Sequence, residues 1–274
     1  MILYIHCDDN PITYNKKNYL LRAAKRLGLD YIKDYKDKGD EEAEYVLNVE
    51  PCGPTTGTKW TALWHIDVLL DNGRCPGSYP GMDKVYVSTD QGKYPQENTD
   101  VLFQACDPEL HKRDESIEQE FDFVICGSNG GGIWNKRELA FNLLKESDFT
   151  YKDYGKDHKP EIYVQNINHA KVQFIRTGES DEGKGACAQR FFECLAIGPV
   201  LTNYTDDIPL LGLVEDVDLL TYKDEPDMVK QMDKLINDKE LRDTIAANGR
   251  RKALLYHSYE SRLVAILNDI NDFI

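Results

Sequence analysis

The sequence lacks any long hydrophobic run. No stretch approaches the ~20 apolar residues that a membrane-spanning helix needs, and the strand-like start at residues 1–6 has neither the basic beginning nor the long apolar segment of a signal peptide. The seven cysteines are scattered, odd in number and free of any CxxC pair. This usage is typical of a reducing compartment. We therefore expect a cytoplasmic protein that holds no metal.

Positive charge is also scarce. The 274 residues carry 48 acidic and 33 basic side chains, a net charge of −15, which argues against nucleic-acid partners because phosphate contacts need lysine and arginine. One segment differs, since residues 15–38 hold eight basic and three acidic side chains. The plainer interpretation is a solvated helix face. The alternative is a surface for an anionic partner, on which we place Lys17, Arg22, Lys25 and Arg26.

Two nucleotide-binding motifs are missing. The chain has neither a GxGxxG fingerprint with its partner acid nor a Walker A motif. A Tyr-x-x-x-Lys pair is absent from a suitable place, because Lys17 stands three positions after Tyr14 rather than four. These absences count against a Rossmann-like epimerase or dehydrogenase, an alternative that stays open. No DxD motif lies in a plausible loop, which fits chemistry without a metal.

Apolar strand-like runs alternate with amphipathic helical ones, a pattern typical of an α/β protein with parallel sheets. A strand–loop–helix sequence begins at residue 1 and again at about residue 122, and a polar, helix-poor stretch at 107–120 separates the two. Further along the chain, a short helix is predicted around 167–171. We predict two Rossmann-like domains, an N-terminal one over 1–115 and a C-terminal one over 116–256.

Ligands of such sheets bind outside the carboxyl ends of the strands. The loop "GSNGGGIWNKR" at 127–137 follows one predicted strand and opens a helix. Its glycines let the backbone approach a ligand, and the helix N-terminus favours an anion. A plain tight turn explains the same residues equally well. The candidate phosphate contacts here are Gly127, Ser128 and Asn129.

A stronger candidate is "IRTGESDEGKGACAQRFFE" at 175–193, where a strand ends in a polar loop before a helix opens. Arg190 and Glu193 share a face of that helix at i,i+3 spacing. Arginine can grip a diphosphate with two hydrogen bonds, and a carboxylate can accept hydrogen bonds from ribose hydroxyls. The alternative is a surface ion pair worth ~0.3–0.5 kcal/mol. We add Arg176, from the same loop, to the predicted donor-binding residues.

Several short pieces, in order along the chain, resemble the spore-maturation-protein-B-like branch of group 1 glycosyltransferases, which have the GT-B fold. They are residues 105–111, 122–128, 167–174, 190–203, 216–250 and 257–263. The resemblance implies two Rossmann-like domains facing a central cleft, with a final helix at 257–274 that crosses back to the N-terminal domain. It also implies that Glu193 holds the ribose of a sugar nucleotide, while Arg190 and Lys184 hold its diphosphate.

The sequence departs from that family at one position. Many group 1 enzymes have two glutamates eight positions apart, and Gly185 occupies the place of the first. A non-catalytic nucleotide-sugar-binding protein is therefore an alternative to an enzyme. The N-terminal half resembles the family less clearly, and its best match is at residues 62–71.

The expected reaction is transfer of a sugar from a UDP-sugar to a hydroxyl acceptor, with no cofactor beyond the nucleotide-sugar co-substrate. Arginine, lysine and helix-end N–H groups stabilise the departing diphosphate without a metal. The family suggests a retaining route. The acceptor is a saccharide or glycan or, as the alternative, a hydroxymethylated base in phage-type DNA. Candidates for the group that takes the acceptor proton are Asp8, Asp9, His65 and Asp67.

Overall fold

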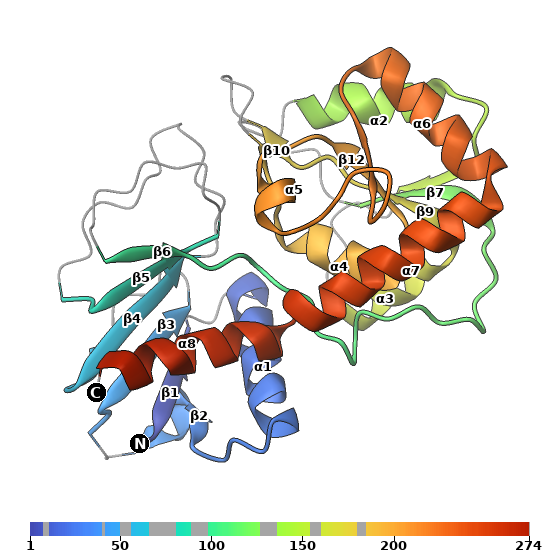
Figure 1. Cartoon of the computed structure of the whole chain (residues 1–274). Helices are drawn as coiled ribbons and strands as arrows, with labels where there is room; N and C mark the ends of the chain where they lie inside the picture. Colours follow the sequence, from blue (N-terminus) through green and yellow to red (C-terminus); the bar gives the residue numbers. More distant parts are fainter. Residues whose placement is uncertain are drawn as a thin grey trace. The chain divides into compact units, whose positions relative to one another are not determined.

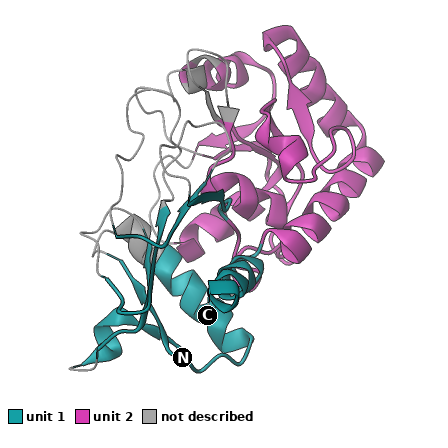
Figure 2. Cartoon of the chain, turned by 60° about the vertical axis from the view of Figure 1, so that its left-hand side comes forward, with its two compact units in different colours: residues 1–104, 258–274 teal, residues 105–257 magenta. Residues whose placement is uncertain are grey.

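The structure is a computed structural model that describes residues 1–7, 11–39, 42–49, 56–65, 81–88, 98–126, 136–153, 160–179 and 185–273. The chain divides into two compact units (Figure 2). Unit 1 is Met1–Gln104 with Ser258–Ile274, and unit 2 is Ala105–His257. The sequence placed the boundary after residue 115, whereas the division falls after Gln104. The polar stretch that follows Gln104 therefore folds with unit 2.

Unit 1 contains a six-stranded sheet in which every neighbouring pair of strands is parallel, with the order β2-β1-β3-β4-β5-β6. Its strands are β1 (Leu3–His6), β2 (Ile32–Asp34), β3 (Tyr45–Val49), β4 (Trp60–His65), β5 (Lys84–Val87) and β6 (Thr99–Val101). The remaining elements of this unit are a short 3-10 helix (Tyr35–Lys38), α1 (Pro11–Arg26) and α8 (Tyr259–Phe273).

Helix α1 has one apolar face that packs into unit 1. Its core face is the buried set Tyr19, Leu20, Ala23 and Ala24. The helix ends where expected, because Gly28 takes a left-handed conformation with φ of 69° and the Leu29 N–H donates to the Ala24 carbonyl. Such a C-terminal turn favours glycine, which has no Cβ to clash.

Helix α8 belongs to unit 1, although it comes last in the chain. It packs beside α1 (Figure 1), and Arg262 donates from Nε to the Phe103 carbonyl at 2.6 Å and from Nη2 to the Gln104 carbonyl at 3.1 Å. The Tyr86 hydroxyl of β5 donates to Asp269 at 2.7 Å. Burial, helped by that carboxylate, raises the pKa of Tyr86. The last helix is thus fastened to the first sheet.

Unit 2 contains a five-stranded parallel sheet with the order β13-β12-β9-β7-β8. Its strands are β7 (Phe121–Ile125), β8 (Tyr151–Asp153), β9 (Ala170–Phe174), β12 (Val200–Asn203) and β13 (Leu220–Tyr222), with a small antiparallel pair β10 (Gly178–Glu179) and β11 (Gly185–Ala186). Its helices are α2 (Lys136–Glu146), α3 (Pro160–Asn168), α4 (Gln189–Ile197), α5 (Asp207–Leu210), α6 (Glu225–Asn237) and α7 (Lys239–Tyr256).

The core of unit 2 lies between this sheet and helices α2, α6 and α7, where side chains such as Phe123, Phe141, Phe174 and Met232 are buried together. The short helix expected around 167–171 is wrong in its position. Helix α3 ends at Asn168 and β9 begins at Ala170, because residues 170, 172 and 174 alternate into the core as a strand requires. Within the described residues, no helix is long and apolar enough to cross a membrane.

Candidate functional site

The carboxyl ends of β9, β12 and β13 bring four polar side chains to one edge of the unit 2 sheet. Thr177 follows β9 and donates to Asn203 Oδ1 at the end of β12, from its backbone N–H at 2.8 Å and from its hydroxyl at 3.0 Å. Arg176 Nη1 donates to the hydroxyl of Tyr222, at the end of β13, at 3.1 Å. The loop that leads toward α4 is therefore fixed to the sheet at its start.

The apolar side chains of helix α4 are almost completely buried and hold the helix in place. Phe191, Phe192 and Leu195 are all 0% exposed, and Gly198 ends the helix. A Cβ at Gly198 would lie 2.6 Å from Gln173 Oε1, so any larger residue here would require the Gln173 side chain to shift. This packing fixes where the polar face of the first turn points. The sequence predicted that a helix opens here.

Glu193, the one acidic residue of α4, is only 2% exposed. Its Oε1 accepts from Gln189 Nε2 at 2.7 Å, and its Oε2 accepts from Arg190 Nη1 at 2.9 Å. Burial raises the pKa of the Glu193 carboxyl, but the charge of Arg190, the electrostatic attraction of His111 and the two hydrogen bonds outweigh it and hold the pKa below its ordinary value. The group is therefore a charged acceptor inside the protein.

Arg190 lies at the boundary between this buried carboxylate and solvent. Its side chain is 37% exposed, and its guanidinium carbon stands 3.6 Å from the centroid of the Tyr163 ring, on α3. The Tyr163 hydroxyl lies 3.2 Å from Cys194 Sγ. Burial lowers the pKa of Arg190, and the Glu193 charge more than reverses this. A stacked, half-exposed guanidinium of this kind can exchange one anionic partner for another.

The sequence did not single out His111, which completes the cluster. Its side chain is 0% exposed, and its Nε2 lies 3.4 Å from Glu193 Oε1. The backbone N–H of Asp107 donates to His111 Nδ1 at 2.8 Å. A signal was present, because the piece at 105–111 was among those that carry the family resemblance. Nothing in the local pattern, however, indicated that its histidine would reach α4.

A family model described as glycosyl transferase-like matches residues 109–268, which is more than half of the chain. The chain belongs to the glycosyl transferase-like family. A search of curated protein sequences finds no significant match.

Solved glycosyltransferase structures share the fold of this family member. AviGT4, involved in avilamycin A biosynthesis, is 10% identical, with a TM-score of 0.67 over 100% of this chain and 98% of its own. Anabaena HepE in complex with UDP is 13% identical, with a TM-score of 0.62 over 99% of each chain. S. aureus TarM, in complex with UDP among other ligands, is 14% identical, with a TM-score of 0.57 over 85% of this chain and 57% of its own. The two parallel sheets are therefore those of a GT-B-type α/β fold.

Several predicted residues of this glycosyl transferase-like protein lie outside the described residues. They are the donor-side Gly127, Ser128, Asn129 and Lys184 and the acceptor-side Asp8, Asp9 and Asp67. His65 ends β4 and pairs with Val87 of β5 through the backbone, but its side chain is not among those described. Their roles stay predictions.

The basic residues of α1 do not form one surface. Lys17 is 0% exposed and donates to Asp34 Oδ2 at 2.6 Å. The two side chains form an internal ion pair that joins α1 to β2. Arg22, Lys25 and Arg26 are exposed, as their i, i+3, i+4 spacing suggested. Arg26 forms an ion pair with Glu260 of α8.

A histidine of unit 1 was overlooked by the sequence reasoning. His6 ends β1, and its Nδ1 lies 3.2 Å from Asn48 Oδ1 on β3. Asn48 donates its own Nδ2 to the Ala62 carbonyl at 3.2 Å, which orients the amide so that its oxygen faces His6. The Nδ1 of a neutral His6 therefore carries the proton, and its Nε2 carries the lone pair.

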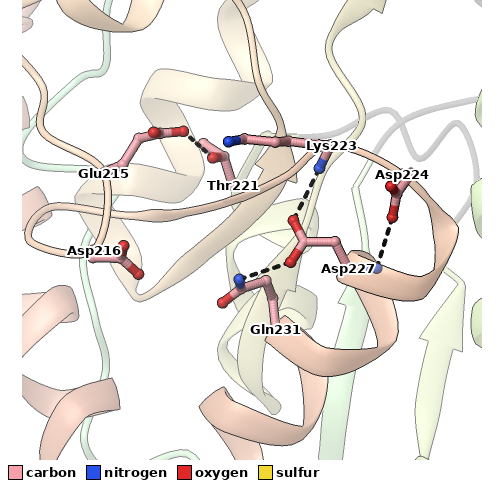
Figure 3. A pocket seen from close by; sticks show the side chains of 7 residues that line it. All are labelled: Glu215, Asp216, Thr221, Lys223, Asp224, Asp227 and Gln231. Atoms are coloured by element: carbon pink, nitrogen blue, oxygen red, sulfur yellow. Dashed lines mark hydrogen bonds between the residues drawn. The ribbon is translucent and has the colours of Figure 1, made fainter.

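A cavity of about 280 Å³ lies between the end of β13 and the start of α6 (Figure 3). Four carboxylates line it, from Glu215, Asp216, Asp224 and Asp227, against one lysine, Lys223. Asp227 Oδ2 accepts from the Lys223 backbone N–H at 3.1 Å. A wall of this charge repels a diphosphate, so the cavity is a poor donor site. Within the described part of the chain, no group of three or more His, Cys, Asp or Glu side chains is arranged to hold a metal ion.

Proposed function

We propose that this protein transfers a sugar from a UDP-sugar to a hydroxyl acceptor, and that unit 2 holds the donor against the first turn of α4. The observation that carries the proposal is the buried, charged Glu193 beside the half-exposed Arg190. Its setting, at the carboxyl edge of a parallel sheet in a glycosyl transferase-like chain, is where such folds bind nucleotides.

Binding in this proposal exchanges the partner of Arg190. The guanidinium turns from Glu193 toward the donor diphosphate, and Glu193 Oε2 becomes the acceptor for a ribose hydroxyl. Charge that builds on the leaving diphosphate is stabilised by Arg190, by Arg176, by Lys184 and by N–H groups of the loop at 127–129, with no metal required. The resemblance to the spore-maturation-protein-B-like branch supports a retaining route.

The acceptor hydroxyl belongs to the unit 1 side in this proposal. His6 joins Asp8, Asp9, His65 and Asp67 as a candidate proton acceptor, because its hydrogen bond with Asn48 places the proton of the neutral ring on Nδ1. A saccharide acceptor is favoured over hydroxymethylated DNA. Lys17 is buried against Asp34 and Arg26 is paired with Glu260, so α1 offers a polyanion less charge than its sequence suggests.

The first experiment measures thermal unfolding of the full chain with millimolar UDP, GDP or ADP. A ligand that binds only the folded protein raises the midpoint, and we expect the largest rise with UDP. Asp218→Asn, which alters a buried ion pair with Lys252 elsewhere in unit 2, serves as the control and should keep the UDP response. No response to any diphosphate would exclude the proposed donor site.

The second experiment separates the acceptors. UDP-sugars are incubated with a saccharide panel and with hydroxymethylated DNA, at low and at high salt. Transfer to DNA should fall steeply with salt, because the logarithm of the DNA-binding constant changes with the logarithm of the salt concentration by a slope of roughly −0.9 per neutralised phosphate. Transfer to a saccharide should not depend on salt in this way. Donor binding without transfer or hydrolysis would favour the non-catalytic alternative, which the glycine at position 185 keeps open.

A further inference from the structure

We propose that His111 is a positioning residue of the donor site, which holds the Glu193 carboxylate in place for the ribose while Arg190 turns to the diphosphate. The inference deepens the proposed function and rests on it. It assigns to His111 a role in recognising the ribose hydroxyls, through Glu193 and without touching the donor.

The hydrogen bond at His111 Nδ1 shows which ring nitrogen carries the proton. His111 Nδ1 accepts the Asp107 backbone N–H at 2.8 Å, and an N–H cannot point at a protonated nitrogen. The proton of a neutral ring therefore lies on Nε2. That nitrogen lies 3.4 Å from Glu193 Oε1, outside hydrogen-bond geometry. The polar Nε2–H group is therefore next to a carboxylate that it attracts electrostatically.

The segment that carries His111 is itself fixed within unit 2. The His111 N–H donates to the Asp107 carbonyl at 2.8 Å, and the Cys106 N–H donates to the His257 carbonyl at 2.9 Å. Asp107 Oδ1 accepts the Glu109 N–H at 3.0 Å. Asp107 and His111 are both 0% exposed. The imidazole is thus held by its own turn as well as by burial.

Gln189, Arg190 and His111 are the three polar neighbours of Glu193, and a ligand can displace some of them more easily than others. Gln189 and Arg190 come from the same helix as the carboxylate, and both are partly exposed. His111 comes from a different segment and is fully buried. When a diphosphate draws Arg190 away, the contact with His111 persists and Oε2 is left to accept a ribose hydroxyl. The Glu193 carboxylate therefore keeps its orientation when the ribose binds.

The test compares UDP with 2′-deoxy-UDP, because only UDP offers the full ribose to Glu193. Affinities of the full-length protein are measured by calorimetry for wild type, His111→Leu and His111→Gln. Wild type should prefer UDP by about tenfold or more, the factor expected for one hydrogen bond to a charged group. His111→Leu should lose most of that preference. His111→Gln, which keeps an N–H donor, should restore most of it.

The matched control is His257→Leu, which removes another buried histidine of unit 2. Its Nε2 lies 3.0 Å from the Leu211 carbonyl, and the proposal gives it no part in binding. It should keep the wild-type preference for UDP over 2′-deoxy-UDP. A merely structural role for His111 would lower both affinities by the same factor in His111→Leu, which would overturn the inference.

An independent measurement reads the tautomer directly. In ¹⁵N-histidine-labelled protein, the ring nitrogen shifts of His111, assigned through its variants, should report a proton on Nε2. A neutral ring with its proton on Nδ1 would overturn the inference even if UDP binds. Failure of wild type to bind any nucleoside diphosphate would instead remove the proposed function, so the two failures are distinguishable.

Discussion

A carboxylate that is almost out of contact with water normally takes up a proton, because burial disfavours its charged form. Glu193 avoids this because two hydrogen-bond donors and one nearby imidazole, from two different segments, surround it. Gln189 and Arg190 come from its own helix, and His111 comes from a turn that precedes the sheet of unit 2. The sum of their effects keeps the pKa of Glu193 below its ordinary value.

Glu193→Gln tests this balance through stability. Because the folded-state pKa is lowered, the charged carboxylate stabilises the fold above its unfolded-state pKa of about 4.5, and this stabilisation is lost as the pH falls through and below that value. We expect the variant to be less stable at pH 7 by ~1–3 kcal/mol. The difference from wild type should shrink toward pH 3 in urea unfolding.

Glu115→Gln is the control, since the Glu115 side chain is 86% exposed. It should change stability little at either pH. A Glu193→Gln deficit that stayed constant from pH 7 to pH 3 would mean that packing, rather than charge, explains the loss.

Arg190 offers a second test at the scale of one side chain. Arg190→Ala removes both the partner of Glu193 and the proposed diphosphate contact, and we expect UDP binding to weaken by ~1.5–3 kcal/mol. Uridine, which has no diphosphate, should lose less. Arg190→Lys should recover little, because an ammonium cannot reproduce the planar fork or the stacking on Tyr163. Unchanged UDP affinity in both variants would show that the donor binds elsewhere.

At the scale of elements, the position of α4 depends on close packing against α7. Gly249 of α7 lies so near that a Cβ there would stand 2.5 Å from the Asp218 carbonyl oxygen and 2.7 Å from Leu195 Cδ1. Leu195 is on α4, so the glycine sets how closely the helix that carries Glu193 can approach α7. The contact between α4 and α7 therefore helps to fix the position of Glu193 in the proposed donor site.

Gly249→Ala should therefore destabilise the protein. Alanine is favoured over glycine inside a helix by about 1 kcal/mol, but the added methyl group must displace backbone as well as a side chain, which costs roughly 1–3 kcal/mol. Urea unfolding should show a net loss of stability. Arg251→Ala, at an exposed position of the same helix, should stay within about 0.5 kcal/mol of wild type. A stabilised Gly249→Ala would mean that α7 has room to move.

For the molecule as a whole, the chain returns to its first unit after completing the second. Helix α8 joins unit 1 through Arg262, which bonds the Phe103 and Gln104 carbonyls, and through Asp269, which accepts from Tyr86. Its buried face, including Leu263, Ile266 and Ile270, adds apolar side chains to the interior of unit 1.

A chain that ends at His257 should therefore lose unit 1 before unit 2. We expect hydrogen exchange to speed up in β1, β3 and β4, while β7 and β9 keep their protection. The full-length chain measured under the same conditions is the reference. Equal loss of protection in both sheets would show that the two units unfold as one cooperative block.

The sequence by itself determined the elements and the family. The strands and α4 follow from local apolar periodicity, and the pairing of Arg190 with Glu193 follows from helical spacing, since both depend on residues within one turn of each other. Tertiary structure decided the rest. His111 and Glu193 are separated in the sequence by five strands, β7 to β11. Lys17 is buried because Asp34 lies opposite it, and the stretch expected to separate the domains folds into unit 2. Contacts of this kind depend on which segments the completed sheet brings together, and no local pattern records that arrangement.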